Sequence, residues 1–227
     1  AFDLLTHDMT SWDVSVACWA ACEGVESTNL SFIAPLLRRR LSPLAKCALH
    51  VANTCAREVP SVSFVFASRH GELQRTVELL GNLAHDEELS PTLFSLSVLN
   101  SAAGIFSIAH NDHAPATAIA AGSESFGYGL LEAHMRARRD PDRPVVYIYA
   151  DAPAPDPLGR QPGDPEATFA LGLLIESKGA TCLHTEIHPD TSTQTSPSLQ
   201  ASACLQALKG GVGEWAGERH HWRWSLQ

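Results

Sequence analysis

Basic residues are scarce in this sequence. Its 16 lysines and arginines are outnumbered by 25 aspartates and glutamates, so the formal net charge is −9 with histidine neutral. Proteins that bind nucleic acids usually present a basic face to the phosphates. The charge balance therefore argues against a nucleic acid as partner.

Long apolar runs are also missing. No stretch approaches the roughly 20 uninterrupted apolar residues that a membrane-spanning helix needs. Residues 1–8 contain neither the basic region nor the long apolar region of a secretory leader. We therefore expect a cytoplasmic protein with no membrane span.

Neither the cysteines nor the histidines indicate a covalent or metal framework. The six cysteines are dispersed through apolar segments, which favours reduced core thiols over the disulfides of a small secreted domain. Among the eleven histidines, the pairs His184/His188 and His220/His221 have no third ligand in a supporting context. We expect no metal and no cofactor.

The sequence has enough apolar residues for a packed domain. With 44% apolar residues among 227, a single fold of this size should bury roughly 70% of its unfolded surface. No internal repeat or low-complexity domain divides the chain, so we predict one domain over residues 1–227. A surface loop is expected at 152–166, where prolines and glycines exclude regular structure.

Strand and helix patterns alternate along the chain. Ser42 is the expected N-cap of a helix that begins at Pro43, and a turn at Lys178-Gly179 is expected to join two late strands as a hairpin. This order indicates an α/β fold whose mixed sheet has helices on both faces. The predicted strands are 14–20, 61–67, 115–121, 144–151, 167–177, 180–188 and 219–225, and the predicted helices are 43–58, 71–85, 99–109, 123–139 and 198–209.

The candidate chemistry lies between residues 114 and 133. There an apolar strand turns sharply through Gly122-Ser123 into a helix, as at a nucleophile elbow, where a helix N-terminus stabilises a thiolate or an oxyanion. No cysteine stands in the turn, and the G-x-S-x-G spacing is not met. Ser123 or Ser125 would act only with a general base within reach. An ordinary structural turn is the alternative.

Several short motifs occur in a fixed order before the turn at Ser123: Ser90-Pro91, Asn100, Ala102-Ala103-Gly104 and Ala114-Pro115. In this order they resemble the N-terminal half of β-ketoacyl synthases, which have the thiolase fold, and the nucleophile position of that pattern falls on Ser123. Residues 37–42, 66–72, 95–100 and 222–224 are similar to the short ketosynthase-like chain length factors of aryl polyene clusters. The likeness covers nearly the whole chain.

The resemblance implies a non-catalytic subunit. Ser123, flanked by Gly122 and Glu124, replaces the nucleophilic cysteine, and the second half that supplies two histidines and a lysine in the family is not in the sequence. The implied protein forms a heterodimer with a full-length ketosynthase and meets the acyl carrier protein through that complex. It closes the end of the acyl tunnel and so sets polyene length.

The same resemblance assigns two sets of residues. In ketosynthases the strand before the elbow pairs with its counterpart across the dimer axis, and a nearby helix lines the acyl pocket. Ordinary core packing is the alternative at each tunnel position, and a central strand of the chain's own sheet is the alternative for the interface strand. The implied interface residues are Pro115, Thr117, Ile119 and Ala121, and the implied tunnel residues are Val98, Ser101, Ile105 and Phe106.

Two other functions stay open. One is a serine hydrolase that uses Ser123 or Ser125 with a histidine, and the other is a homodimeric scaffold. The basic run Arg38-Arg39-Arg40 is either a docking site for an acidic carrier protein or a solvated face. Glu124 is favoured by the helix dipole and would also fill the space of an acyl thioester.

Overall fold

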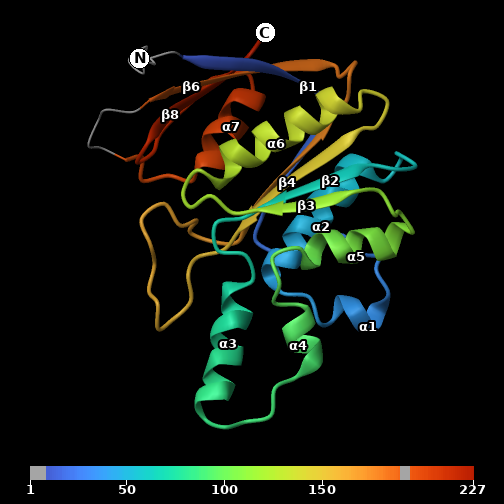
Figure 1. The fold of residues 1–227 in the computed structure, drawn as a ribbon, viewed down its shortest axis with the longest axis vertical. Coiled ribbons are helices and arrows are strands. Elements are labelled where there is room, and N and C mark those ends of the chain that lie inside the picture. Colours follow the sequence, from blue (N-terminus) through green and yellow to red (C-terminus); the bar gives the residue numbers. More distant parts are fainter. Residues whose placement is uncertain (1–8, 190–194) are drawn as a thin grey trace, which may run out of the picture.

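The computed structural model describes residues 9–189 and 195–227. Within them, eight strands form one mixed sheet in the order β3-β2-β4-β5-β1-β6-β8-β7 (Figure 1). β2 is parallel to β3 and β4, and the other neighbouring strands are antiparallel. The strands are β1 Thr10–Glu23, β2 Ser63–Ala67, β3 Ala116–Ile119, β4 Val145–Asp151, β5 Phe169–Ile175, β6 Thr181–Pro189, β7 Val212–Ala216 and β8 His220–Leu226.

Helices cover both faces of this sheet. α2 and α5 pack on one face, and α6 and α7 pack on the other, where the β6–β8 end of the sheet curls over them (Figure 1). Two short helices and the longer α3 lie outside these layers. The helices are α1 Pro35–Arg38, α2 Pro43–Ala56, α3 Leu73–Ala84, α4 Pro91–Ser95, α5 Ser101–His110, α6 Ser125–Arg139 and α7 Gln200–Leu208.

Each face of the sheet has its own apolar core. β4 contributes to both, because its side chains alternate: Val146 and Ile148 join the α2–α5 core, whereas Val145 and Tyr147 join the α6–α7 core. A strand covered on both faces is apolar along nearly its whole length, as β4 is up to its last residue, Asp151. The predicted α/β fold with a mixed sheet between helices is confirmed.

The start of α2 is stabilised by an N-terminal cap that the sequence predicts. The hydroxyl of Ser42 accepts a hydrogen bond from the backbone N–H of Ala45 at 2.9 Å, and Pro43 stands at the first helical position. The cap satisfies an N–H group that the helix itself leaves unpaired. The cap and the start of this helix are confirmed.

The predicted hairpin between β5 and β6 is wrong. These strands do not pair with each other, because β1 lies between them and pairs antiparallel with both. The Lys178-Gly179 segment crosses over β1, where the backbone N–H of Gly179 donates to the Ser15 hydroxyl at 2.6 Å. A Cβ at position 179 would lie 2.6 Å from the backbone of Val16, so glycine is required by this close approach.

Other elements differ from the sequence-based expectation in extent or are additional to it. β1 runs from residue 10 to 23 rather than from 14 to 20. β7, α1 and α4 are elements that the sequence patterns do not predict. Residues 152–166 form an irregular connection, as expected. The expectation of no leader rests on residues 1–8, which lie outside the described part of the chain.

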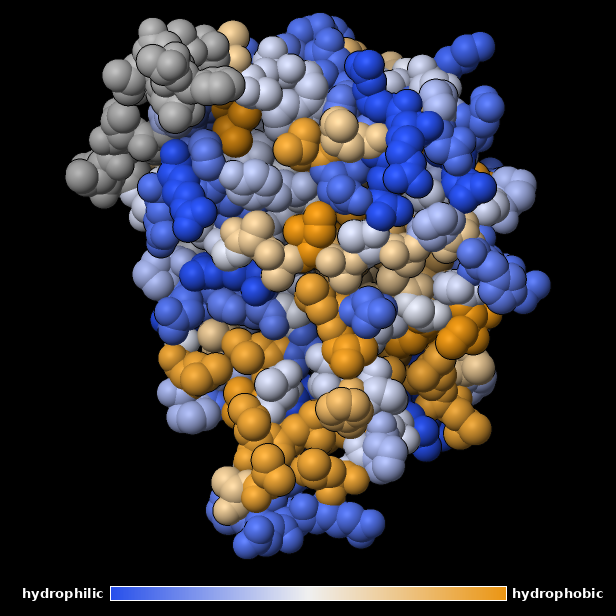
Figure 2. Space-filling view, viewed as in Figure 1, coloured by the Kyte–Doolittle hydropathy of each residue, from blue (hydrophilic) through white to orange (hydrophobic). Residues whose placement is uncertain are grey.

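α3 and α4 project from the layered body as an arm (Figure 1). Apolar side chains gather on this arm (Figure 2), and Leu80, Leu83 and Phe94 are exposed on it. Among the helices of the described residues, none has both the length and the apolar character of a bilayer span.

Candidate functional site

The turn between β3 and α6 is closed by a buried serine. Gly122 has a φ of +60°, a left-handed conformation that glycine adopts without steric cost. The Ser125 hydroxyl accepts a hydrogen bond from the backbone N–H of Ala121 at 2.9 Å and donates one to the Gly122 carbonyl oxygen at 2.7 Å. The sharp turn predicted at Gly122-Ser123 is present, and Ser125 is part of its framework.

A cavity of about 570 Å³ lies beside this turn, and Ser123 and Arg69 line it. A serine nucleophile needs a general base within hydrogen-bonding distance. Among the described residues, no hydrogen bond joins Ser123 or Ser125 to a histidine, and the Ser125 hydroxyl is already bonded to the backbone.

Glu124 is almost fully buried at the start of α6, and its carboxylate is turned toward β8. One carboxylate oxygen accepts hydrogen bonds from His220 Nδ1 at 2.8 Å and from Trp222 Nε1 at 3.1 Å. Burial, together with the negative charge of Glu124, raises the pKa of the nearby Tyr128 hydroxyl above its usual value. Glu124 thus joins the turn to the last strand, 96 residues further along the chain.

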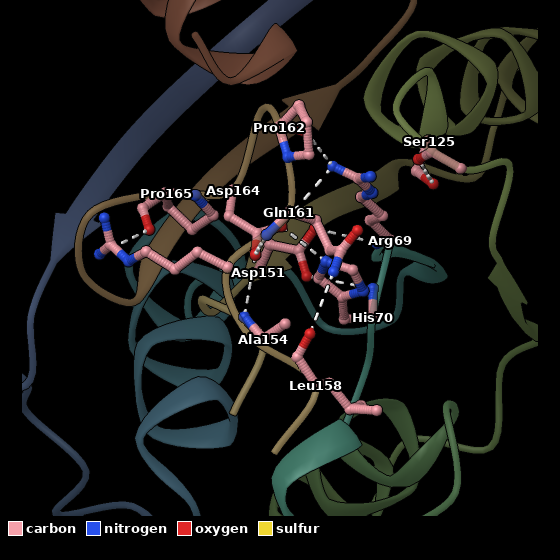
Figure 3. Close-up of polar contacts among 12 residues, drawn as sticks. Arg69, His70, Ser125, Asp151, Ala154, Leu158, Gln161, Pro162, Asp164 and Pro165 are labelled. Carbon is pink, nitrogen blue, oxygen red and sulfur yellow. Dashed lines mark hydrogen bonds and ion pairs between the residues drawn. The ribbon is translucent and has the colours of Figure 1, made fainter. Parts of the chain in front are cut away.

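Asp151 holds the chain that leads from β2 to the cavity wall (Figure 3). Its buried carboxylate accepts hydrogen bonds from the Ser68 hydroxyl at 3.1 Å, the Tyr149 hydroxyl at 2.9 Å, and the backbone N–H groups of Arg69 and His70 at 3.0 and 3.2 Å. Burial raises the pKa of Asp151 above its usual value, against the hydrogen bonds that lower it. The backbone beside Arg69 is therefore fixed by a single carboxyl group.

Asp164 fastens the proline-rich loop 152–166 to the same wall (Figure 3). Its carboxylate lies 2.7 Å from His70 Nε2 and 3.6 Å from Arg69 Nη1, and it accepts hydrogen bonds from the backbone N–H groups of Ala154 (3.0 Å) and Gln161 (2.8 Å). Burial opposes ionisation, but these hydrogen bonds bring the pKa of Asp164 below its usual value. Arg69 also donates to the Pro162 carbonyl oxygen at 2.6 Å.

A second cavity, of about 480 Å³, lies between α5 and β3 and is called the α5–β3 groove below. Most of its walls are small side chains or backbone. At Gly104, a Cβ would meet no atom within 4 Å. The residues that line it are Leu99, Asn100, Ala103, Gly104, Ser107, Ala114, Ala116 and Ala118.

The four residues expected in an acyl tunnel occupy different surroundings. Val98 is exposed just before α5, and Ser101 is partly exposed at its first turn. Ile105 and Phe106 are buried in the α2–α5 core, where the Phe106 ring lies 5.1 Å from the ring of Phe64. The α5–β3 groove is therefore lined by the adjacent face of α5, and Ile105 and Phe106 lie behind it.

β3, which carries the expected interface residues, is the end strand of the sheet. The carbonyl oxygens of Pro115 and Ile119 accept hydrogen bonds from backbone N–H groups on the β2 side, at 2.9 and 3.2 Å. Because peptide groups alternate along a strand, the N–H and C=O groups of Ala116 and Ala118 point away from β2.

The side chains on the α6 face of β3 are half-buried and turned toward this chain's own helix. The Thr117 hydroxyl accepts a hydrogen bond from the guanidinium of Arg136 in α6, and Ile119 lies two residues further along the same face. Ala121 belongs to the turn, where its N–H bonds to Ser125. The outward groups of the edge are thus the backbone of Ala116 and Ala118.

Within the residues described, no cluster of three or more histidine, cysteine, aspartate or glutamate side chains is arranged to hold a metal ion. The six cysteines are free thiols. The groups that fix the cavity wall were not predicted as a set, because His70 and Asp164 are 94 residues apart. One signal was available: Asp151 is an acidic residue at the end of an otherwise apolar strand.

Solved structures define the class of fold. A chain of the complex of the ketosynthase ApeO with its chain length factor ApeC from Xenorhabdus doucetiae superposes with a TM-score of 0.80 and 24% identity, over 94% of this chain and 99% of that chain. The ishigamide ketosynthase/chain length factor superposes with a TM-score of 0.61 and 15% identity, over 87% of this chain and 72% of that chain. The fold is thiolase-like.

The sequence then assigns the family. Residues 11–225 match the family model described as beta-ketoacyl synthase, N-terminal domain. The chain therefore belongs to the β-ketoacyl synthase family. None of the curated proteins that were compared matches it.

Proposed function

We propose that this chain is a non-catalytic chain length factor that pairs with a full-length β-ketoacyl synthase and shapes the acyl tunnel in aryl polyene elongation. The observation that carries the proposal is the end strand β3. Its outward backbone groups at Ala116 and Ala118 lie beside the α5–β3 groove. The likeness to a chain of a ketosynthase–chain length factor complex supports this choice of partner.

An open strand edge next to an apolar groove is suited to pairing with another strand. Unpaired N–H and C=O groups in a row form a template for a further strand, and native proteins usually cover or block such an edge. A partner strand would bond to the outward groups of Ala116 and Ala118. The roles of Pro115, Thr117, Ile119 and Ala121 in this interface would be indirect, through the conformation of the strand that presents those groups.

The second part of the proposal is that this subunit does not catalyse the condensation. Ser123 stands at the nucleophile position of the family pattern, and a ketosynthase nucleophile is a cysteine thiolate. Serine without a neighbouring base is a poor nucleophile, and His220 is bonded to Glu124, the residue that follows Ser123. The ketosynthase partner would therefore supply the catalytic groups and the principal docking site for the acyl carrier protein.

The α5–β3 groove is the proposed contribution to the acyl tunnel. Its small residues leave room for an apolar chain that arrives from the partner across β3. Val98 and Ser101 would meet the chain near the start of α5, and Ile105 and Phe106 would support the groove from the core. Larger side chains in the groove should shorten the product, because they remove space without adding contacts elsewhere.

Co-expression with a full-length ketosynthase tests the pairing. The expected result is a stable 1:1 complex by size-exclusion chromatography with mass measurement. Ala118→Pro should abolish it, because proline removes an N–H group that points to the open edge while the bonds from β3 to β2 remain. Ala118→Ser, which keeps the N–H group, is the matched control. A complex of unchanged stability with Ala118→Pro would contradict pairing through β3.

Product length tests the tunnel. Gly104→Leu in the complex should shorten the polyene, whereas Gly81→Leu in α3, where a Cβ also meets no atom within 4 Å, should leave the length unchanged. Equal product distributions for both variants would exclude the α5–β3 groove as part of the acyl tunnel.

The two alternatives have distinct outcomes. Labelling of Ser123 by a fluorophosphonate in the isolated chain would favour a serine hydrolase. A dimer of this chain that does not exchange with the ketosynthase would favour the homodimeric scaffold.

A further inference from the structure

The arm formed by α3 and α4 carries apolar side chains that the rest of the chain does not bury. Leu80, Leu83 and Phe94 are 58%, 59% and 61% exposed. Figure 2 shows apolar surface gathered over the lower part of the molecule, where Figure 1 places the arm. Single exposed leucines are normal on a protein surface, but a group of them on one projection marks an interaction site.

α3 has the residue pattern of a helix that packs against another surface. Leu73, Val77 and Leu80 recur at helical spacing, Leu83 flanks them, and Glu78 stands on the opposite side. Of the 12 positions of α3, all of them described, only one is buried. A helix of this length is marginal in water unless its apolar face is packed. We therefore expect a surface outside this chain to cover it.

The arm leaves the body of the protein beside the α5–β3 groove. Residues 96–100 join α4 to α5, and Leu99 and Asn100 of this segment line the groove. Leu99 also reaches the base of α3, since its side chain would lie 3.0 Å from a Cβ at Gly71. Val98 beside it is exposed. The apolar surface of the arm thus leads into the groove that β3 borders.

The charges of the arm favour a protein over a lipid surface. Its tip consists of Asp86, Glu87 and Glu88, and all three are exposed. Anionic lipid head groups attract basic segments and repel acidic ones. A protein interface, in contrast, combines an apolar centre with a charged rim. The partner that fits this arm has an apolar recess with basic side chains at its border.

The β3 edge is too short to hold a partner by itself. β3 has 4 residues, whereas a stable and specific interface buries roughly 1,200–2,000 Å² in total. Contacts outside β3 are therefore needed for a stable pair. The arm is next to the edge, projects from the body and has an uncovered apolar face.

We propose that the arm is a second contact with the full-length ketosynthase. The subunit that pairs with β3 buries Leu80, Leu83 and Phe94 in an apolar recess and places basic side chains opposite the acidic tip. The choice of partner rests on the proposed function. The position of the contact rests on the exposed leucines and on their continuity with the groove.

Hydrogen exchange followed by mass spectrometry tests where the ketosynthase binds. In the isolated chain the amides of α3 should exchange rapidly, whereas those of α2, which has nine buried residues, should exchange slowly. In the co-expressed complex with a full-length ketosynthase, peptides of α3 and α4 should become protected together with those of β3. Protection of β3 without protection of the arm would overturn the second contact and leave the proposed function intact.

Substitutions on the two sides of α3 test the energetics. The double variant Leu80→Gln, Leu83→Gln removes most of the exposed apolar face and keeps good helix formers. Because both leucines are exposed, the Tm of the isolated chain should not fall. The Kd of the complex should rise about 10- to 100-fold, since two leucines lose their burial. Glu78→Gln, on the opposite side of the helix, is the matched control. An unchanged Kd for the double variant would contradict the second contact.

Other occupants of the arm give different results. A dimer of the isolated chain that the leucine substitutions abolish would assign the arm to a second copy. Sedimentation with phosphatidylcholine–phosphatidylglycerol vesicles, lost in the same variant, would assign it to a membrane. Either result, with an unchanged Kd for the ketosynthase, would overturn the inference. If the unsubstituted chain forms no complex with the ketosynthase, the proposed function and the second contact both fail.

Discussion

Replacing Gly104 by alanine should stabilise the isolated chain. Gly104 lies inside α5 and is exposed, and a Cβ at this position would meet no atom within 4 Å. The substitution therefore adds no clash and fills no part of the core. What changes is the conformational freedom of the unfolded chain, which glycine increases.

The magnitude follows from helix propensity. Alanine is favoured over glycine in a helix interior by about 0.8–1 kcal/mol, which corresponds to about 2–4 °C in Tm for a domain of 150–250 residues. Gly127 and Gly129 in α6 should behave in the opposite way. A Cβ at Gly127 would lie 2.6 Å from the ring of Trp222, and one at Gly129 would lie 2.6 Å from the Cβ of Ala67. Overpacking of this kind costs about 1–3 kcal/mol or more.

Urea denaturation followed by tryptophan fluorescence measures all three variants. The expected order of stability places Gly104→Ala above the unsubstituted chain and both α6 variants below it. A Gly104→Ala chain that is less stable than the unsubstituted one would refute the reasoning, because it would mean that position 104 is already in contact with other atoms. If Gly104→Ala stabilises the chain and also alters product length in the complex, the change in length cannot be attributed to impaired folding.

Two predictions concern the polar groups around the turn. Asp164→Asn should destabilise the protein by about 1.5–3 kcal/mol at pH 7, since it removes a carboxylate with charge-assisted hydrogen bonds. Because the pKa of Asp164 is lower in the folded than in the unfolded protein, its contribution is present above about pH 4 and is lost as the pH falls through the folded pKa. Urea titrations at pH 7 and pH 3 should therefore show a smaller difference between the two proteins at acid pH, and an equal difference at both would show that the charge is irrelevant. His220→Ala should cost about 1–3 kcal/mol, because buried Glu124 keeps only Trp222 as a side-chain donor. Thermal unfolding measures this loss, which His220→Asn should partly restore, and an unchanged Tm for His220→Ala would rule out the pair as a stabilising contact.

The local elements of the fold were predictable because their signals lie within a few residues. Ser42-Pro43 marks the start of α2, the apolar run before Asp151 marks β4, and Gly122-Ser123 marks the turn into α6. Each signal acts through a backbone conformation or a cap that needs no distant partner.

The arrangement of these elements depended on distant contacts. Nothing near Lys178-Gly179 shows that β1 lies between β5 and β6, because a crossover and a hairpin use the same turn residues. The orientation of α5 could not be predicted from the sequence either. Its residues are small or apolar on nearly every side, so the sequence does not show which face meets the core. The structure places Ile105 and Phe106 toward α2 and leaves Gly104 at the groove.

The position of β1 also affects the order in which the protein can be completed during synthesis. β1 leaves the ribosome long before its partner strands, which are about 150 residues later: Ala21 pairs with Leu171, and Val14 pairs with Leu183. At about 5–20 residues per second, this strand waits on the order of ten to thirty seconds with both edges unpaired. The sheet can close only when β5 and β6 have emerged, so translation speed and chaperone binding to the first strand should determine the yield of folded protein.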